Sequence, residues 1–399
     1  MLISPTKDRR RQIVILGGGP AGSSAAIRLA RAGLEVTLIE KAAFPRPKLC
    51  GEFISPECLK HFDALDVSAD IMSGGGASIR ETVFYDRRGR SIAVPSRWFA
   101  GSENALSLSR AQLDAHLLNA AGRAGAEVFT ETTATRVIMR GREIEAVHVR
   151  DAAGDSHELR ADLYIDATGR SAVLGKLVAR ALPGKDDRSQ AKPKLVAFKA
   201  HLRAPGVDRS RCEIYSFTGG YGGLSPVEGG LANLCIVVDS KTARAFKSDI
   251  QMLAEKVVSV NPQARESLRN AEMAGEALAV AIQSFGKKAL KAADNAFSVG
   301  DAAGFIDPFT GSGILMSLEG SEILASAIIE GRADVLAVSA QYENEFDRRF
   351  ANRLRLCRIL RLAAFRPRLA TAAIVLLGAS KIAREIVAKR TRGEYIGEN

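Results

Sequence analysis

The 399-residue sequence lacks several features on which common classes of protein depend. Its five cysteines are odd in number and form no C-x-x-C pair, a composition that favours neither a disulfide framework nor a zinc site. No run of 18 apolar residues is present, so no segment is predicted to span a membrane. The five histidines have no Asp and Ser spaced as in a hydrolytic triad. We expect a protein of the reducing cytoplasm without a metal site.

Excess basic charge is confined to one part of the chain. Residues 348–399 contain thirteen Lys or Arg against three Glu, a net of +10, whereas the whole chain carries +11. The remainder is close to neutral, so we expect no nucleic-acid partner. Residues 1–12 are polar and basic, and no signal peptide is predicted there.

The stretch from Gln12 to Glu40 has the pattern of a nucleotide-binding unit. Ile13 to Leu16 is a short β-branched, apolar run, typical of a strand buried on both faces. A helix-forming segment, Ala21 to Ala32, and a second strand, Glu35 to Ile39, follow. A G-x-G-x-x-G motif joins the first strand to the helix, where its mechanism requires it. Its glycines are Gly17, Gly19 and Gly22.

These glycines have separate physical roles. Gly17 permits the tight turn, Gly19 lets the backbone approach a pyrophosphate, and Gly22 allows close packing of helix on strand. The helix N-terminus, with Pro20 and Ala21, offers free N–H groups and a positive dipole end to phosphates. Glu40, which lies 18 residues after Gly22, can accept hydrogen bonds from a ribose. The alternative is a glycine-rich turn without a ligand.

The segment after Glu40 is predicted to be a loop, because Pro45 and Pro47 forbid a helix. It carries Lys41, Arg46 and Lys48, followed by Cys50-Gly51-Glu52. Further along, Thr82–Tyr85 and Ser91–Val94 are predicted to form a hairpin. Ser109 is the expected N-cap of an amphipathic helix that begins at Arg110. Three later runs are predicted to form a β-meander: Arg136–Met139, Ala146–Arg150 and Leu163–Ala167.

Three separated motifs together resemble a known family. They are the Gly17–Glu40 stretch, Asp166-Ala167-Thr168-Gly169, and Gly300-Asp301-Ala302-Ala303-Gly304 with Asp307-Pro308 and Gly311-x-Gly313. The chain resembles flavoproteins of the p-hydroxybenzoate hydroxylase fold. Within them it resembles the geranylgeranyl-reductase-like branch, with some features of the flavin-dependent halogenases.

The resemblance implies an α/β fold with three parts. A Rossmann-type FAD-binding domain would comprise residues 11–82, 105–175 and 291–335. An inserted antiparallel β-sheet substrate domain would comprise 83–104 and 190–290, with Ala181 to Pro193 as a polar linker. Residues 336–399 would form a C-terminal helical region.

The resemblance also implies which residues contact FAD. Asp301, at a strand end, would bind the ribityl hydroxyls. The helix that opens at Gly311, Gly313 and Ile314 would place its N–H groups and dipole at the flavin N1–C2 edge. Arg110 corresponds to an arginine that contacts FAD in this family, although it could equally be a surface residue. The other expected contacts are Gly17, Gly19, Pro20, Ala21, Gly22, Glu40, Lys41, Lys48, Cys50 and Gly51.

The loop around Cys50 is the candidate catalytic segment. In the reductase-like proteins a Cys-Gly pair lies close to the isoalloxazine. Cys50 could therefore hydrogen-bond the flavin, hold it covalently or touch substrate, or be an inert loop cysteine. Glu52 is the nearest acid for proton transfer, with a solvated loop acid as the alternative.

The expected substrate pocket includes Tyr221, Pro226, Pro308 and Phe309. The family's Tyr-x-Trp-x-Phe-Pro stretch corresponds here to Tyr221-Gly222-Gly223-Leu224-Ser225-Pro226. Both bulky rings are replaced, which predicts a wider pocket. The halogenase signature Trp-x-Trp-x-Ile-Pro is absent.

These features predict an FAD-dependent oxidoreductase with NAD(P)H as reductant. The main interpretation is a monooxygenase acting on a hydrophobic or aromatic small molecule. The alternatives are a geranylgeranyl-reductase-like enzyme that reduces C=C bonds and a membrane-docked electron carrier. The basic C-terminal region either caps the substrate cavity or attaches peripherally to anionic lipid.

Overall fold

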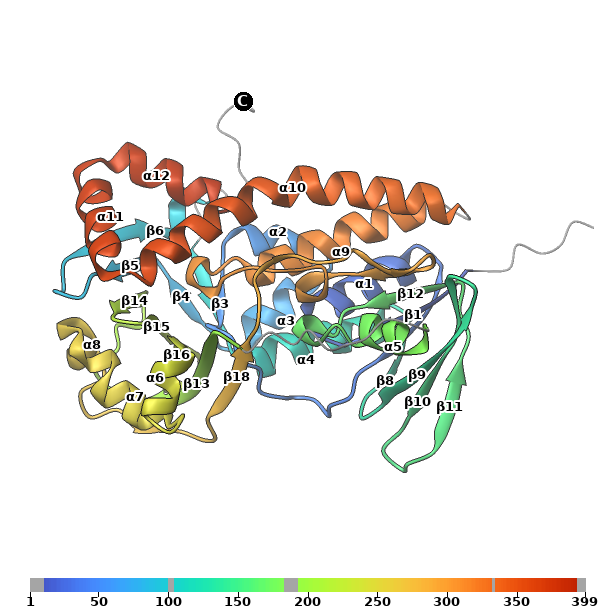
Figure 1. The fold of residues 1–399 in the computed structure, drawn as a ribbon, viewed down its shortest axis with the longest axis horizontal. Coiled ribbons are helices and arrows are strands. Elements are labelled where there is room, and N and C mark those ends of the chain that lie inside the picture. The colour runs from blue at the N-terminus through green and yellow to red at the C-terminus, as the bar shows by residue number, and fades with distance from the viewer. Residues whose placement is uncertain (1–10, 100–103, 183–192, 332–333, 393–399) are drawn as a thin grey trace, which may run out of the picture.

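The computed structural model describes residues 11–99, 104–182, 193–331 and 334–392. Its two main parts each contain a sheet, and long helices lie across the top of both (Figure 1). The linker predicted for Ala181 to Pro193 lies mostly outside the described residues, because only its first and last residues are included.

A six-stranded sheet forms the nucleotide-binding part. Its strands are parallel apart from the edge strand β20, which is antiparallel to β21. The order is β20 (Lys291–Ala293), β21 (Ala296–Ser298), β12 (Leu163–Asp166), β1 (Gln12–Leu16), β2 (Glu35–Ile39) and β8 (Glu127–Phe129). The buried, β-branched strand β1 lies in the interior of this sheet, as such a run predicts.

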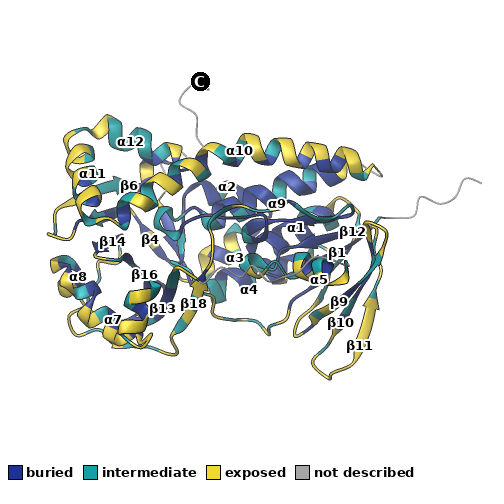
Figure 2. Cartoon of the chain, viewed as in Figure 1, coloured by how far each residue is buried: buried dark blue, intermediate teal, exposed yellow. Residues whose placement is uncertain are grey.

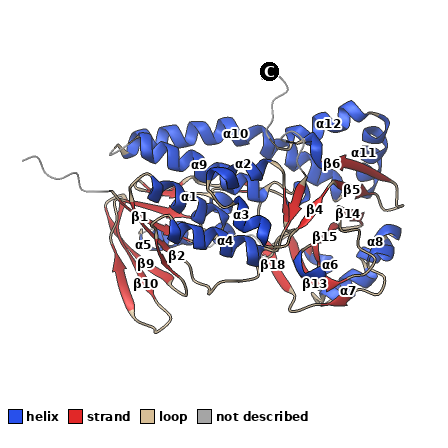
Figure 3. Ribbon diagram, turned by 180° about the vertical axis from the view of Figure 1, so that it is seen from behind, coloured by secondary structure: helices blue, strands red, loops and turns tan. Residues whose placement is uncertain are grey.

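Helices cover one face of this sheet and build the main core. They include α1 (Pro20–Arg31), α2 (Glu57–Ala64), α3 (Ser68–Ser73), α4 (Arg110–Arg123) and α9 (Gly313–Glu330) (Figure 3). The hydroxyl of Ser109 accepts a hydrogen bond from the N–H of Gln112 at 3.2 Å, so Ser109 caps α4 as predicted. The prediction of a Rossmann-type α/β fold is confirmed.

The predicted β-meander is wrong in its third strand. β10 (Glu143–Arg150) pairs with β9 (Thr133–Arg140) on one side and with β11 (Ser156–Leu159) on the other in a separate sheet, whereas β12 enters the parallel sheet beside β1. All four residues of β12 are buried, as a strand covered on both faces requires. Helix α5 (Val173–Ala181) packs with β9 and β10 against the second face of the parallel sheet.

The second part is built on an eight-stranded sheet in which every pair is antiparallel except β5 with β14. The hairpin of β5 (Glu81–Tyr85) and β6 (Ser91–Pro95) forms as predicted. It joins this sheet through β5, which begins two residues before the predicted domain boundary at residue 83. The remaining strands are β13 (Leu195–Arg203), β14 (Arg211–Phe217), β15 (Gly220–Pro226), β16 (Ala232–Asp239), β17 (Glu272–Met273) and β18 (Leu278–Ile282). Short helices α6 (Ser240–Ala245), α7 (Ile250–Lys256) and α8 (Pro262–Ser267) accompany this sheet.

Two small sheets and several single helical turns complete the described part of these two units. β3 (Phe53–Ile54) and β4 (Ala77–Ile79) flank β7 (Ala105–Ser107), and β19 (Gly286–Lys287) pairs with β22 (Gly304–Phe305). The turns are η1 (Ser96–Trp98), η2 (Gly169–Ser171), η3 (Glu228–Gly230), η4 (Val258–Val260), η5 (Gly300–Ala302) and η6 (Pro308–Thr310).

The C-terminal region forms three helices, α10 (Val335–Ala364), α11 (Pro367–Ala379) and α12 (Lys381–Arg390). α10 packs on α9, and α11 and α12 lie over β5 and β6, with their outer faces largely exposed (Figure 2). Among the described residues no single helix has the length and apolar composition of a membrane span. The bent pair α10 and α11, at 114°, meets those two criteria only together.

Candidate functional site

The glycine loop has two kinds of glycine. Gly17 has φ +105°, and a Cβ there would lie 2.5 Å from the carbonyl oxygen of Ala167. A Cβ on Gly22 would lie 1.9 Å from the carbonyl oxygen of Gly17. Both positions therefore require glycine for the fold itself. A Cβ on Gly19 would meet nothing closer than Arg110 Nη2 at 3.7 Å. The fold itself therefore leaves room for a side chain at position 19, where the backbone is open to a ligand.

Glu40 lies at the end of β2, as predicted, and is buried. Its Oε2 accepts a hydrogen bond from the N–H of Gly18 at 2.9 Å, and its Oε1 accepts one from the N–H of Ala42 at 3.1 Å. These bonds hold the carboxylate against the glycine loop.

Basic side chains face the glycine loop across the cavity. Arg110 forms a two-pronged ion pair with Asp114, at 2.6 and 2.8 Å, and Arg46 reaches the same carboxylate at 3.3 Å. Lys48 has no hydrogen-bond or ion-pair partner for its ammonium among the described residues. Burial, together with the charges of Arg46 and Arg110, lowers the pKa of Lys48 to about 8. Together these side chains form an incompletely neutralised cationic cluster, which suits a diphosphate.

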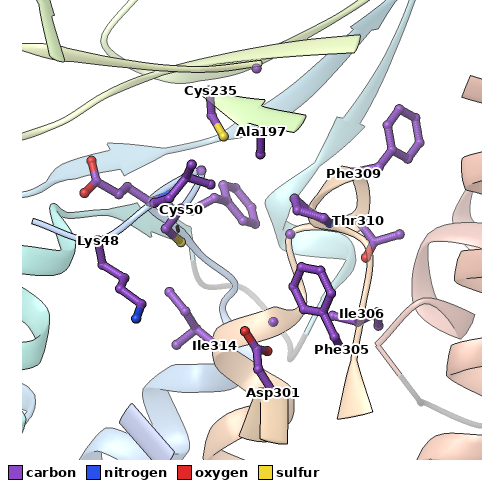
Figure 4. A pocket seen from close by; sticks show the side chains of 18 of the residues that line it. Lys48, Cys50, Ala197, Cys235, Asp301, Phe305, Ile306, Phe309, Thr310 and Ile314 are labelled. Carbon is purple, nitrogen blue, oxygen red and sulfur yellow. Dashed lines mark hydrogen bonds between the residues drawn. The ribbon is translucent and has the colours of Figure 1, made fainter. Parts of the chain in front are cut away.

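Asp301 extends from η5 into the same cavity, close to Ile314 (Figure 4). Its carboxylate has no hydrogen bond or ion pair within the described ranges. Burial raises the pKa of Asp301, although the charges of Arg170 and Arg110 oppose this. Gly300, just before it, has φ +59°, and a Cβ there would come within 2.8 Å of the Ala21 side chain. The turn therefore brings a carboxylate with free acceptor sites beside the N-terminus of α1.

The loop carrying Cys50 is anchored by Glu52. Glu52 is fully buried and adopts φ +57°, a left-handed conformation that is strained for a non-glycine residue. Its Oε1 accepts from the N–H of Arg110 at 2.8 Å, and its Oε2 accepts from His201 Nε2 at 2.7 Å. Lys199 also pairs with Glu52. The surroundings thus fix the carboxylate in place.

Opposing effects act on the pKa of Glu52. Burial raises it, but the hydrogen bond from His201 and the charge of Lys199 outweigh burial and hold it below 4.5. Lys199 Nζ also donates to the carbonyl of Lys48 at 3.1 Å, so β13 holds both ends of the loop. The role of Glu52 in proton transfer stays a prediction, while its contacts indicate an ionised anchor.

One cavity of about 780 Å³ joins these features to the second sheet. Figure 4 shows Lys48, Cys50 and Asp301 on one side of it and Ala197 and Cys235 on the facing sheet. The predicted cofactor and catalytic residues that line it are Gly17, Gly19, Pro20, Ala21, Glu40, Lys41, Lys48, Cys50, Gly51, Glu52, Arg110, Asp301, Gly311, Gly313 and Ile314. Gly22 lies behind the loop, in the packing of helix on strand.

Three of the four predicted pocket residues also line this cavity: Tyr221, Pro308 and Phe309. Tyr221 OH donates to Asp307 Oδ1 at 2.7 Å, and its ring packs edge-on against Phe309. The prediction is wrong for Pro226, which does not line the cavity. Alternate residues of β15 point to opposite faces, so Tyr221 and Pro226 cannot share one.

Several site residues were not in the predicted set. Arg46 belongs to the predicted loop but not to the predicted site residues. Arg170, directly after the Asp166–Gly169 motif, lines the cavity with its guanidinium over the Phe305 ring. Lys199 and His201 lie about 150 residues from Glu52 in sequence. They carry no motif that could have revealed them.

Comparison with known proteins agrees with this geometry. The model of the family described as "FAD binding domain" matches residues 10–346. The chain is 29% identical over 349 residues to the digeranylgeranylglycerophospholipid reductase of Methanosarcina mazei, covering 84% of this chain and 80% of that protein.

Two solved structures show the same fold. A geranylgeranyl bacteriochlorophyll reductase-like protein from Thermoplasma acidophilum superposes with a TM-score of 0.78 at 22% identity, covering 98% of this chain and 97% of that chain. PqsL, a probable FAD-dependent monooxygenase from Pseudomonas aeruginosa, superposes with a TM-score of 0.69 at 18% identity, covering 91% and 99%.

Proposed function

We propose that this chain, which belongs to the FAD-binding domain family and is an FAD-dependent oxidoreductase, acts on a hydrophobic substrate held between its second sheet and its C-terminal helices. Membership rests on the family match over residues 10–346. The residues of the glycine loop fit FAD, because the position of Gly19 needs no glycine until a ligand is bound.

FAD would lie along the row of predicted contacts. Its diphosphate would bind between the glycine loop and the cationic cluster of Arg46, Lys48 and Arg110. Glu40 would contact the ribose, and Asp301, with free acceptor sites, the ribityl chain. Bound FAD supplies the two-electron chemistry, with NAD(P)H as the reductant. The chain's own residues bind, orient and exclude water.

The observation that carries this proposal is the continuity of the cavity. The predicted FAD contacts and an apolar chamber belong to one continuous cavity. The chamber walls are apolar or small side chains from both the sheet and the helices. They include Ile92, Val94, Ile214, Val280, Ala373, Ile374 and Leu377. A hydrophobic molecule in this chamber would have a direct path to the flavin.

Two reactions fit this arrangement. Monooxygenation is the main interpretation of the sequence. Reduction of a C=C bond is the second candidate, favoured by the thiols of Cys50 and Cys235 on the cavity wall. In a monooxygenase, a thiol beside the oxygen-activating centre would be liable to oxidation. In a C=C reductase, the thiol of Cys50 could donate a proton to the alkene. The name of the M. mazei relative also favours reduction.

Product analysis tests both reactions. The FAD-bound protein is incubated with NADPH, labelled O₂ and either geranylgeraniol or 2-naphthol, and the products are examined by mass spectrometry. A gain of one labelled oxygen supports monooxygenation, and a gain of two hydrogens supports C=C reduction. If neither substrate changes while an added quinone is reduced, the chain is an electron carrier and the proposal fails.

We further propose that the outer faces of α11 and α12, with the end of α10, attach to anionic lipid. Large apolar side chains are exposed there beside basic ones that form no ion pair within the described ranges, and each basic residue near such a surface contributes about 1 kcal/mol. The apolar residues are Ile359, Leu362, Leu369, Val375, Leu376 and Ile382. The exposed basic residues are Arg355, Arg358, Arg366, Arg368, Lys381 and Arg390.

Sedimentation with phosphatidylserine vesicles tests this attachment. Deletion of the helices is unsuitable, because Ala370 and Ile374 of α11 line the cavity. A double variant, Leu376→Glu with Ile382→Glu, should lose salt-sensitive binding and keep its FAD. Met252→Glu, on α7 in the second part, is the matched control. Wild-type protein that ignores the vesicles at low salt would refute the attachment.

A further inference from the structure

One end of the cavity is bounded by α12, the residues just after it and η1. Here the guanidinium of Arg384 lies over the ring of Trp98 at 5.5 Å, and that of Arg392 lies over the ring of Phe99 at 5.0 Å. Arg384, Arg392 and Phe99 line the cavity. The apolar contacts of Trp98, Phe99 and Ala388 pack α12 against η1. Two cations are thus fixed in the cavity wall by aromatic stacking.

Stacking leaves the hydrogen-bonding capacity of both cations unused. A guanidinium stacks through its face, while its five N–H donors point outward in its plane. Neither guanidinium donates to an acceptor or forms an ion pair within the described ranges, and Nε of both and Nη1 of Arg392 are buried without a partner. Arg392 is only 6% exposed. A buried cation in this state costs free energy unless a ligand pairs with it.

Among the described residues, the charges around this end of the cavity leave it positive. The acids that line the cavity are Glu40, Glu52 and Asp301, all among the predicted FAD-side residues. Glu57 is the acid whose charge acts on Arg392, but it does not line the cavity and lies beyond ion-pair distance. Burial lowers the pKa of Arg392, which is consistent with incomplete compensation.

We propose that Arg384 and Arg392 form a subsite for an anionic oxygen group, a carboxylate or a phosphate, at one end of the hydrophobic substrate. The inference rests on the proposed function and adds that the substrate is an amphiphile with an acidic group. Arginine forks pair with both oxygens of such groups.

The position of the subsite indicates where the reacting part of the substrate would lie relative to its acidic group. The Arg392 guanidinium also lies 5.8 Å from the centre of the Phe53 ring. That ring contacts Gly311, where a Cβ would come within 2.9 Å of it. Phe53 therefore lies between Arg392 and the predicted flavin edge. The reacting carbon would lie past Phe53, within the cavity.

Binding of matched amphiphiles to the FAD-bound protein tests the subsite. Dodecanoate, dodecyl phosphate and dodecanol are titrated below their aggregation concentrations, and binding is followed by the change in flavin absorbance. Wild-type protein should bind at least one of the two anions about tenfold or more tightly than the alcohol, as expected for charge-assisted hydrogen bonds.

Arg384→Gln and Arg392→Met should reduce this preference for anions while leaving dodecanol binding unchanged. Arg392→Lys should restore part of it. Arg180→Gln, an exposed arginine of α5 that lies outside both the cavity and the C-terminal helices, is the control. Thermal unfolding identifies a variant that fails to fold. If Arg392→Met does not fold, the test rests on the anion preference of Arg384→Gln. Whichever of dodecanoate and dodecyl phosphate binds more tightly shows whether the subsite prefers a carboxylate or a phosphate.

The outcomes separate this inference from the proposed function. If dodecanol binds wild-type protein as tightly as both anions, the subsite is refuted and the hydrophobic chamber stands. A preference for anions that persists in both arginine variants also refutes it. If no amphiphile changes the flavin spectrum, the proposed chamber beside the flavin itself fails.

Discussion

Glu52 and His201 are joined by a hydrogen bond of 2.7 Å between Oε2 and Nε2, which ties the Cys50 loop to β13 of the second sheet. Lys199 reinforces this connection from the same strand. The loop at the predicted flavin position is therefore held by the sheet that forms the chamber wall. The distance between flavin and substrate would depend on this contact.

Replacement of Glu52 by Gln is expected to lower the free energy of unfolding by about 3 kcal/mol, because Lys199 is left buried without a counter-charge. The pKa of Glu52 is held below its usual 4.5 in the folded protein. Its contribution is therefore present above pH 4.5 and is lost as the pH falls through the folded pKa. Denaturant unfolding at several pH values measures both effects.

Two comparisons define the role of Glu52. Lys199→Met combined with Glu52→Gln should cost less than the sum of the single changes, whereas Glu345→Gln, a partly exposed ion-pair residue, should cost little. If Glu52→Gln abolishes turnover without changing stability or the flavin spectrum, Glu52 transfers a proton instead of anchoring the loop.

Lys48 should make FAD binding dependent on pH. Its pKa of about 8 in the FAD-free protein rises when a diphosphate binds beside it, so binding takes up a proton above pH 8. FAD affinity should fall by up to about tenfold per pH unit above 8. Fluorescence titrations of FAD-free protein measure this. Lys48→Arg should remove the dependence, and an unchanged slope in that variant would assign it to another group.

Cys50→Ala tests the thiol on the cavity wall. If Cys50 touches the flavin or donates a proton, the variant should shift the flavin spectrum or lower turnover, with unchanged thermal unfolding. Acid precipitation tests for a covalent bond between Cys50 and FAD. If that bond exists, FAD precipitates with the wild-type protein but not with the variant. Cys58→Ala, a buried cysteine of the core, is the control. An unchanged spectrum and rate would show that Cys50 is inert.

The parts of the fold with strong local signals could be predicted from sequence. The strand, glycine loop, helix and second strand from Gln12 to Ile39 each leave a pattern within a few residues. β11 was missed, because Ser156 to Leu159 is mostly polar and exposed. The family motif wrongly places Pro226 in the pocket. In a strand, the alternation of successive side chains between the two faces decides which of them line the cavity, and Pro226 lies on the opposite face from Tyr221.

The anchoring of the site could not be predicted in the same way. The partners of Glu52 come from a strand about 150 residues away, and nothing local marks a glutamate for a left-handed backbone. The stacking of Arg384 and Arg392 likewise depends on how α12 docks on η1. Such contacts exist only once distant segments have packed.

FAD content in the Gly19→Val variant tests the central claim most directly. A Cβ at position 19 would lie no closer than 3.7 Å to any protein atom, the nearest being Arg110 Nη2. The variant should therefore fold, but its side chain should exclude the diphosphate. Wild-type protein should purify yellow with close to one FAD per chain. Gly175→Ala, where a Cβ meets nothing within 4 Å, should do the same. Gly19→Val should be folded and colourless, and full FAD occupancy in that variant would contradict the account.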